Sequence, residues 1–198
     1  MKKLSILLSL VLLSTVAFAQ LPANPEDISP LLIGEKLPDV TVRNIEGKEI
    51  SSNSLWAGKQ TILIFYRGGW CPYCNTQLSQ LNLIEKDIIE LGYQLVAVSP
   101  DKPEKLQESL SKNDLHYTLI SDSNGSFSKA VGIAFQAPDR YEKMLKDAQG
   151  DTGNTHLPVP SVFIINGEGE IIFEYINPNY KVRISSELLL GAAKALKK

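Results

Sequence analysis

The sequence predicts an α/β domain in which a central mixed sheet is flanked by helices. Two apolar, β-rich runs, residues 60–66 and 93–99, are each followed by a segment with helical spacing of its apolar residues. Two further β-rich runs meet at a turn over residues 166–169, and a helical segment ends the chain. Strands that alternate with helices and finish in a hairpin and a helix are typical of this fold class. The 198-residue chain is 43% hydrophobic, enough for one ordinary core with appendages.

Residues 1–19 have the pattern of a secretory signal peptide. Two lysines precede an apolar run over residues 4–16, and residues 17–19 (AFA) form a small-x-small site, so we expect cleavage before Gln20. A membrane anchor is the alternative, but the apolar run is short for a bilayer span and no second run follows. The sequence therefore predicts an exported protein, periplasmic or secreted, with no stable membrane span after processing.

The mature chain is predicted to begin with a linker or leading arm, residues 20–33, which contains three prolines, followed by one domain over residues 34–198. Loss of the two signal-peptide lysines leaves 18 basic and 22 acidic residues, a net charge of −4. The basic residues are scattered rather than clustered, so nucleic acid is not an expected partner. No pattern in the sequence predicts an oligomeric state.

The first half of the domain predicts a hairpin, a strand and a long helix. Residues 40–44 (VTVRN) and 48–52 (KEISS) flank a turn at Gly47 and predict a short N-terminal hairpin. The continuous apolar run at residues 60–66 (QTILIFY) is typical of a strand buried on both faces. The helix behind it is predicted to end near Gly92, a residue type favoured at helix C-termini. Its apolar residues at helical spacing are Leu78, Leu81, Ile84, Ile88 and Leu91.

The alternation continues to the C-terminus. The sequence predicts, in order, a strand at 93–99, a helix at 101–110, a strand at 117–121, a short helix at 126–131 and a hairpin of strands 159–165 and 170–175. Ser185 is expected to cap the closing helix. Residues 138–150 are charged and helical in pattern but stand outside the alternation, so we expect a surface insertion there.

The strongest chemical signal is the pair of cysteines, Cys71 and Cys74, which are the only two in the chain. Pro72 suits the first position of a helix, which places Cys71 at the N-cap and Cys74 in the first turn on the same face. Free N–H groups at a helix start stabilise a thiolate, and such Cys-x-x-Cys pairs have pKa values of about 3.5–7.5. Arg67 would add positive potential if its loop folds back. Geometry alone therefore predicts Cys71 as nucleophile and Cys74 as resolving partner.

Two other roles for the pair are an inert structural disulfide and a metal site. A disulfide that closes so short a loop constrains the unfolded chain little and stabilises the fold weakly. A zinc site usually needs four ligands, and only His116 and His156 are available besides the cysteines, in separate segments. We therefore expect no metal and no other cofactor.

Several motifs together resemble a known family. The stretch IFYRGGWCPYC, after a buried strand, is similar to the thioredoxin superfamily, and WCPYC resembles the redox motif of glutaredoxins and thioredoxins. The segment from Gly34 to Asp39 (G-x-x-x-P-D), together with VAVSPD and SVFIINGEGEI, resembles the peroxiredoxin branch, the alkyl hydroperoxide reductase/thiol-specific antioxidant family. The likeness covers residues 33–197, and R-G-x-W-C-P-Y-C with L-P-V-P resembles the peroxiredoxin-like subgroup. It implies a thioredoxin-like fold and an antioxidant thiol peroxidase that a thioredoxin-like protein reduces.

The chain also departs from the family pattern. Peroxiredoxins carry P-x-x-x-T-x-x-C, which places Arg67 at the proline, Cys71 at the threonine and Cys74 at the peroxidatic cysteine. The family arginine that activates thiol and peroxide falls at Pro160, and Arg67 or Arg183 are candidates to replace it. Cys71 attacks in the thioredoxin alignment and Cys74 in the peroxiredoxin alignment. The sequence leaves this choice open.

Pro160 also resembles the cis-proline that faces the Cys-x-x-Cys pair in thioredoxin-like proteins and shapes their substrate groove. The resemblance predicts a cis bond before Pro160, and a trans proline at a strand start is the alternative. Together with Arg67 and the aromatic Trp70 beside the pair, Pro160 is expected to contact the substrate.

The resemblance favours a peroxidase whose cysteine pair cycles between dithiol and disulfide while it reduces hydrogen peroxide or organic hydroperoxides. The alternative is an exported oxidoreductase that exchanges directly with protein disulfides, which the CPYC motif and the missing arginine favour. A third hypothesis is a binding module that keeps the fold without catalysis. The intact cysteine pair argues against it.

Overall fold

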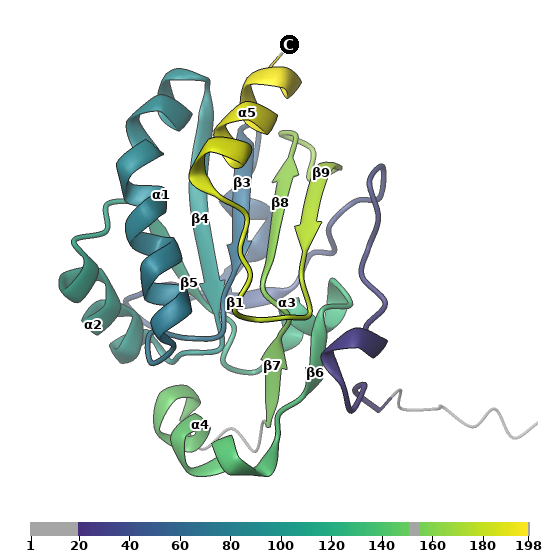
Figure 1. The fold of residues 1–198 in the computed structure, drawn as a ribbon, viewed down its shortest axis with the longest axis vertical. Helices are drawn as coiled ribbons and strands as arrows, with labels where there is room; N and C mark the ends of the chain where they lie inside the picture. The colour runs from purple at the N-terminus through teal and green to yellow at the C-terminus, as the bar shows by residue number, and fades with distance from the viewer. Residues whose placement is uncertain (1–19, 151–154, 198) are drawn as a thin grey trace, which may run out of the picture.

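The computed structural model describes residues 20–150 and 155–197, and it is built on one seven-stranded mixed sheet with the strand order β2-β1-β5-β4-β3-β8-β9 (Figure 1). β3 pairs with β4, and β4 with β5, in parallel, whereas β8 pairs antiparallel with both β3 and β9. The α/β class with a central mixed sheet is therefore confirmed. The strands of this sheet are β1 (Thr41–Arg43), β2 (Glu49–Ser51), β3 (Gln60–Phe65), β4 (Tyr93–Ser99), β5 (Thr118–Ser121), β8 (Ser161–Ile165) and β9 (Ile171–Ile176).

The central strands are largely apolar and buried, which fits a sheet that is covered on both faces by helices or loops. In β3, Ile62 and Ile64 face one core and Leu63 and Phe65 the other, as the period of two for strand side chains requires. The first core lies under three helices, and the second lies under a shorter helix and the N-terminal segments (Figure 1). The helices of the first core are α1 (Pro72–Glu90), α2 (Pro103–Asn113) and α5 (Ser186–Leu196), and the shorter helix of the second is α3 (Ser126–Ala130).

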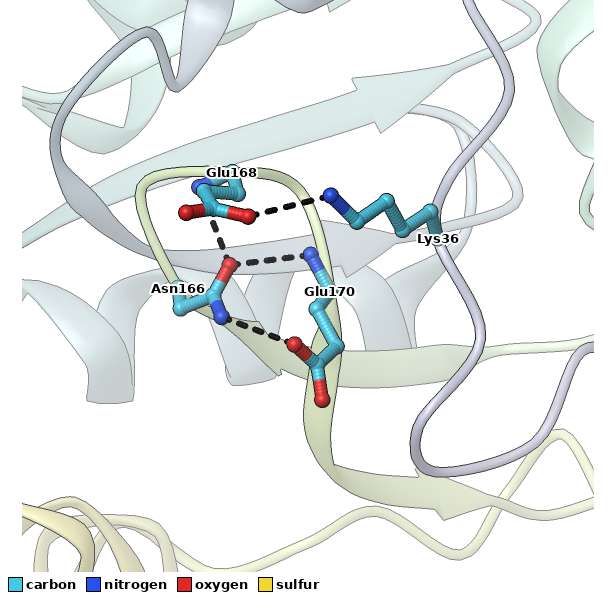
Figure 2. A network of polar contacts seen from close by, with 4 residues as sticks. All are labelled: Lys36, Asn166, Glu168 and Glu170. Carbon is cyan, nitrogen blue, oxygen red and sulfur yellow. Dashed lines mark hydrogen bonds and ion pairs between the residues drawn. The ribbon is translucent and has the colours of Figure 1, made fainter.

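Both predicted hairpins are present. β1 and β2 pair antiparallel around Gly47, and β1 joins the sheet edge through one pair with β5, Arg43 opposite Ser121. The turn between β8 and β9 is organised by Asn166, whose Oδ1 accepts the backbone N–H groups of Glu168 (2.9 Å) and Glu170 (3.0 Å), as Figure 2 shows. These side-chain bonds replace the backbone partners that a tight turn lacks.

The β8–β9 turn is also tied to the start of the domain. Lys36 forms an ion pair with Glu168 at 3.0 Å (Figure 2), although both side chains are exposed and such a pair contributes little stability. The backbone contributes more: Leu37 donates to the carbonyl of Gly169 at 2.9 Å, and Ile171 donates to that of Glu35 at 2.9 Å. The segment around residues 34–39 is thus an extra partner of the hairpin.

One element was not predicted from the sequence. A second, two-stranded sheet pairs β6 (Ala134–Gln136) with β7 (His156–Pro158), and it encloses a small helical insertion, η3 (Asp139–Tyr141) and α4 (Glu142–Gln149). Strands of three residues carry too little alternation to detect. The insertion lies where a charged surface segment was predicted, and Leu145 anchors it in a small separate core.

The leading arm lies against the second sheet and α3. Gln136 of β6 donates a backbone hydrogen bond to the carbonyl of Pro22 (2.8 Å), and Leu31 donates one to Val131 (3.0 Å). The predicted signal peptide, residues 1–19, lies outside the described residues. Within the described part of the chain, no helix is both long and apolar enough to cross a bilayer.

Candidate active site

The cysteines lie at the start of α1, which is the element that follows the central strand β3 in the chain. Cys71 is the N-cap residue, with extended backbone angles (φ −89°, ψ 118°), and Pro72 is the first helical residue. The carbonyl of Cys71 accepts the N–H groups of Cys74 and Asn75, both at 3.1 Å, which closes the first turn. The predicted placement of the pair at a helix N-terminus is confirmed.

The loop before the cysteines is held by a buried carboxylate that sequence reasoning missed. Asp101 follows β4 and accepts the backbone N–H of Gly69 with Oδ2 at 2.7 Å, whereas its Oδ1 has no hydrogen-bond partner in residues 20–150 and 155–197. Burial raises the pKa of this carboxyl to about 7, against the lowering effect of the Gly69 bond. Gly68 beside it has φ +136°, and a Cβ there would lie 2.6 Å from Oδ1 and against the indole of Trp70. The signal was an acidic residue at the carboxyl end of the strand next to β3.

Neither cysteine is part of a disulfide here, and both residues are almost fully buried, Cys71 at 1% exposure and Cys74 at 0%. The pKa of Cys71 is lowered to about 6, chiefly because the Cys74 thiol donates a hydrogen bond to its sulfur. The Cys74 backbone N–H and the charges of Arg67 and Arg183 lower this pKa further, whereas burial raises it. The pKa of Cys74 is raised well above its ordinary value, first by burial and then by the bond to Cys71 and by its charge. The pair therefore shares one proton at neutral pH, with the negative charge on Cys71.

Arg183, one of the two candidates for the missing arginine, contacts the pair. Its Nη2 donates to the Sγ of Cys74 at 3.4 Å, while its buried Nε and Nη1 have no hydrogen-bond partner within the described part of the chain. Arg183 lies between β9 and α5, where Ile184 is buried and Ser185 accepts the N–H of Leu188 at 3.2 Å as the predicted helix cap. A cation with unpartnered N–H groups is thereby fixed beside a buried sulfur.

Arg67, the other candidate, is only 3% exposed and is enclosed by aromatic rings. Its guanidinium carbon lies 5.0 Å from the ring centroid of Trp70, 5.1 Å from Tyr141 and 4.2 Å from Tyr180. These rings come from the cysteine loop, the insertion and the β9–α5 segment, so cation–π contacts join three distant parts of the chain. The condition for Arg67 to add positive potential, a loop that brings it near the pair, is met here: the Arg67 charge contributes to the lowered pKa of Cys71.

Pro160 and Arg67 line one pocket of about 460 Å³, together with Tyr180 and Arg140. Trp70 instead lines a smaller cavity of about 170 Å³ beside Asp101. The roles of Trp70, Pro160 and Arg67 in substrate binding remain predictions.

The predicted cis bond before Pro160 is wrong, because no peptide bond among the described residues is cis. Pro160 directly precedes β8, where its missing N–H removes no ladder bond. Its carbonyl accepts the N–H of Asn177 at 3.3 Å, and Val159 donates to Ile133 at 2.8 Å, so an extended trans chain satisfies the backbone on both sides.

The histidines do not join the cysteines. His156 lies in β7 with its ring against Gly125, and burial lowers its pKa to about 3. Over residues 20–150 and 155–197, no three His, Cys, Asp or Glu side chains gather in a way that would hold a metal ion.

The model of the AhpC/TSA family matches residues 33–174. The chain belongs to this family. It is 30% identical over 106 residues to a putative peroxiredoxin bcp of Haemophilus influenzae, covering 54% of this chain and 68% of that protein. It is 22% identical over 184 residues to the thiol-disulfide oxidoreductase ResA of Bacillus cereus, covering 92% of each chain. The solved structure of reduced Prx3 from Vibrio vulnificus matches with a TM-score of 0.70 at 17% identity, over 83% of this chain and 99% of that one.

Membership of the AhpC/TSA family confirms the thioredoxin-like fold and the predicted class of enzyme, a peroxiredoxin-like thiol peroxidase. The structure also explains how this member departs from the AhpC/TSA motif. Pro160, at the position of the family arginine, begins a strand, and Arg183 brings a guanidinium to Cys74 from a different segment.

Proposed function

We propose that this enzyme reduces hydrogen peroxide or organic hydroperoxides with Cys71 as the attacking thiolate and Cys74 as the resolving thiol. The observation that carries the proposal is the position of Cys71 at the N-cap of α1, where the Cys74 thiol and the nearby arginine charges lower its pKa to about 6 and so favour the thiolate on Cys71. With a pKa of about 6, Cys71 is about 90% thiolate at pH 7, whereas a thiol of pKa 9.0 is about 1% ionised. The thiolate is the reactive nucleophile.

The reaction then follows in two steps. The Cys71 thiolate attacks one peroxide oxygen, so that an S–O bond forms, the O–O bond breaks, and the departing oxygen takes up a proton as water or alcohol. Cys74 gives its thiol proton to that departing oxygen and attacks the sulfur of the sulfenic acid, so that the S–S bond forms, the S–O bond breaks and hydroxide leaves. Because the two cysteines are already hydrogen-bonded within one helical turn, no resolving thiol from elsewhere in the chain is needed.

The cycle is completed by a thiol reductant, for which we propose a thioredoxin-like protein outside the cytoplasm. The signal pattern over residues 1–19 supports export to a periplasm or beyond the cell. An oxidising compartment would leave the pair as a disulfide unless a dedicated donor reduced it. Expression of the full chain in a bacterial host tests this: the protein should appear in the periplasmic fraction with Gln20 as first residue, and full-length protein in the cytoplasm would contradict export.

The peroxidase proposal is tested on fully reduced protein that begins at Gln20. Thiol loss is measured with hydrogen peroxide and with cumene hydroperoxide at pH 7, against free cysteine. We expect loss orders of magnitude faster than for free cysteine, with a Cys71–Cys74 disulfide as product. Cys71→Ser should abolish the fast reaction, and Cys74→Ser should stop it at the sulfenic acid. Rates no faster than free cysteine with both peroxides would refute the proposal.

Direct exchange with protein disulfides is the second candidate. The observation that favours it is the CPYC pair at a helix N-terminus in a chain that aligns over 92% of its length with a thiol-disulfide oxidoreductase. Its test is the mixed disulfide, which Cys74→Ser should trap with an oxidised protein substrate. Slow peroxide reaction together with rapid trapping would favour this function.

A further inference from the structure

Arg183 contacts the deeper of the two sulfurs. Its Nη2 lies 3.4 Å from the Sγ of Cys74, the thiol that is protonated in the resting enzyme. Its Nε and Nη1 are buried and have no hydrogen-bond partner among the described residues, so no carboxylate of this part of the chain accepts from them. The resting state therefore holds a partly buried cation against the buried, neutral thiol of Cys74, and this arrangement needs a chemical reason.

The state of Cys74 must change during the reaction. In the resting enzyme burial, the hydrogen bond to Cys71 and the Cys71 charge all oppose its ionisation. Oxidation of Cys71 to a neutral sulfenic acid removes the charge and the thiolate acceptor. Burial then remains against two groups that favour the Cys74 thiolate, the Arg183 charge and the backbone N–H of Arg67.

We propose that Arg183 is the catalytic residue of the resolving step, where its guanidinium holds the negative charge on Cys74 after Cys71 has been oxidised and so drives disulfide closure. The proposal rests on the peroxidase function proposed above. Until the disulfide closes, the two sulfurs carry one negative charge, which passes from Cys71 to Cys74.

The step balances as follows. The Cys71 thiolate reduces the peroxide by two electrons and becomes a sulfenic acid, and the released hydroxide or alkoxide takes the thiol proton of Cys74. The Cys74 thiolate, paired with Arg183, attacks the Cys71 sulfur, so that the S–S bond forms and the S–O bond breaks. The departing hydroxide takes a proton from solvent. Because Cys74 is fully buried, a charge at 3.4 Å from its sulfur acts more strongly than it would in water.

The test follows the two steps separately in a single turnover of reduced protein with hydrogen peroxide. It is run at pH 8 so that Cys71 stays almost fully ionised even if loss of the Arg183 charge raises its pKa. Sulfenic acid is trapped with dimedone, and closure is followed by mass spectrometry of quenched samples. Arg183→Met should form the sulfenic acid within about three-fold of the wild-type rate but close the disulfide about ten-fold or more slowly. The reason is that a rise of one unit in the pKa of Cys74 reduces its thiolate fraction about tenfold. Sulfinic acid should accumulate at high peroxide.

A pH profile distinguishes this role from a structural one. The closure rate of Arg183→Met should rise with pH through a higher apparent pKa than in the wild type, and Arg183→Lys should restore part of the rate. Lys181→Met is the matched control, because Lys181 is an exposed cation in the same segment and should leave both steps unchanged. If Arg183→Met does not fold, Arg183→Gln removes the charge and keeps a donor.

Two results would overturn the inference, and they differ. Fast sulfenic acid formation with wild-type closure rates and an unshifted pH profile in the charge-free variants would refute the role of Arg183 alone. Wild-type thiols that react no faster than free cysteine with hydrogen peroxide or cumene hydroperoxide would refute the peroxidase function, and the role of Arg183 with it.

Discussion

The shared proton makes a quantitative prediction for Cys74→Ala. The pKa of Cys71 lies about three units below 9.0, a difference on the order of 4 kcal/mol, and the hydrogen bond from the Cys74 thiol is its largest cause. Without that donor, only the Cys74 backbone N–H and the two arginine charges remain to stabilise the thiolate. We expect the pKa to rise by at least about one unit, which reduces the thiolate fraction at pH 7 from about nine-tenths to about half or less. Cys74→Ser, which keeps a hydroxyl donor, should fall between.

The assay is the absorbance of the thiolate at 240 nm between pH 4 and 10 in reduced protein, checked by the pH dependence of alkylation with iodoacetamide. Cys71→Ala is the matched control, and its remaining thiol should titrate above Cys71 in Cys74→Ala. A pKa near 6 that survives in Cys74→Ala would show that the helix start and the arginines suffice, and the shared-proton argument would fail. A pKa near 6 for Cys74 in Cys71→Ala would show that Cys74 ionises readily by itself, and this would contradict the assignment of the thiolate to Cys71.

Two further predictions concern the loop before the cysteines. Burial raises the pKa of Asp101 from 3.8 to about 7, so the folded protein binds more protons than the unfolded chain between these values and stability falls as pH rises through this window. Asp101→Asn keeps an acceptor for Gly69, and its stability relative to wild type in urea unfolding should rise by a few kcal/mol between pH 4 and 8; an unchanged difference would contradict the raised pKa. In Gly68→Ala the new Cβ would meet Asp101 at a backbone φ of +136°, so the variant should lose about 2 kcal/mol or more of stability and react more slowly with peroxide. Gly58→Ala is the control: φ is +72° there, but no described atom lies within 4 Å of the new Cβ. It should lose about 1 kcal/mol of stability and keep the wild-type rate. Equal losses in the two variants would argue against the contact.

The sequence predicted those parts of the site that depend on neighbours along the chain. Pro72 and the cysteine spacing were enough to place Cys71 at the N-cap, because capping is a local rule. Contacts between distant segments were harder: Arg183 is 109 residues from Cys74, and the sequence offered it only as one of two candidates.

The errors have the same physical origin. In the sequence, Asp101 stands out only as the last residue of the VAVSPD motif and the first of a predicted helix. Its role in the cysteine loop was missed because a buried oxygen without a hydrogen-bond partner is a property of the folded loop. Pro160 was assigned by analogy with cis-prolines, but the isomer of this bond depends on backbone partners that the sequence does not contain. The β6–β7 pair brings together segments that the insertion separates, and neither strand is long enough to show a period.

The burial of both sulfurs has a consequence for turnover. A small peroxide can diffuse through brief fluctuations, but the thiol of a protein reductant must be brought to a sulfur that is 1% exposed. In the proposed cycle, reduction of the disulfide by a protein would therefore be coupled to a local opening equilibrium, and its rate would be the intrinsic exchange rate multiplied by the fraction of molecules that are open. Oxidation by peroxide and reduction by a protein thiol should consequently respond differently to temperature and mild denaturant. Loosening of the contacts between Arg67 and Tyr180 should accelerate the reduction step before it affects the reaction with peroxide.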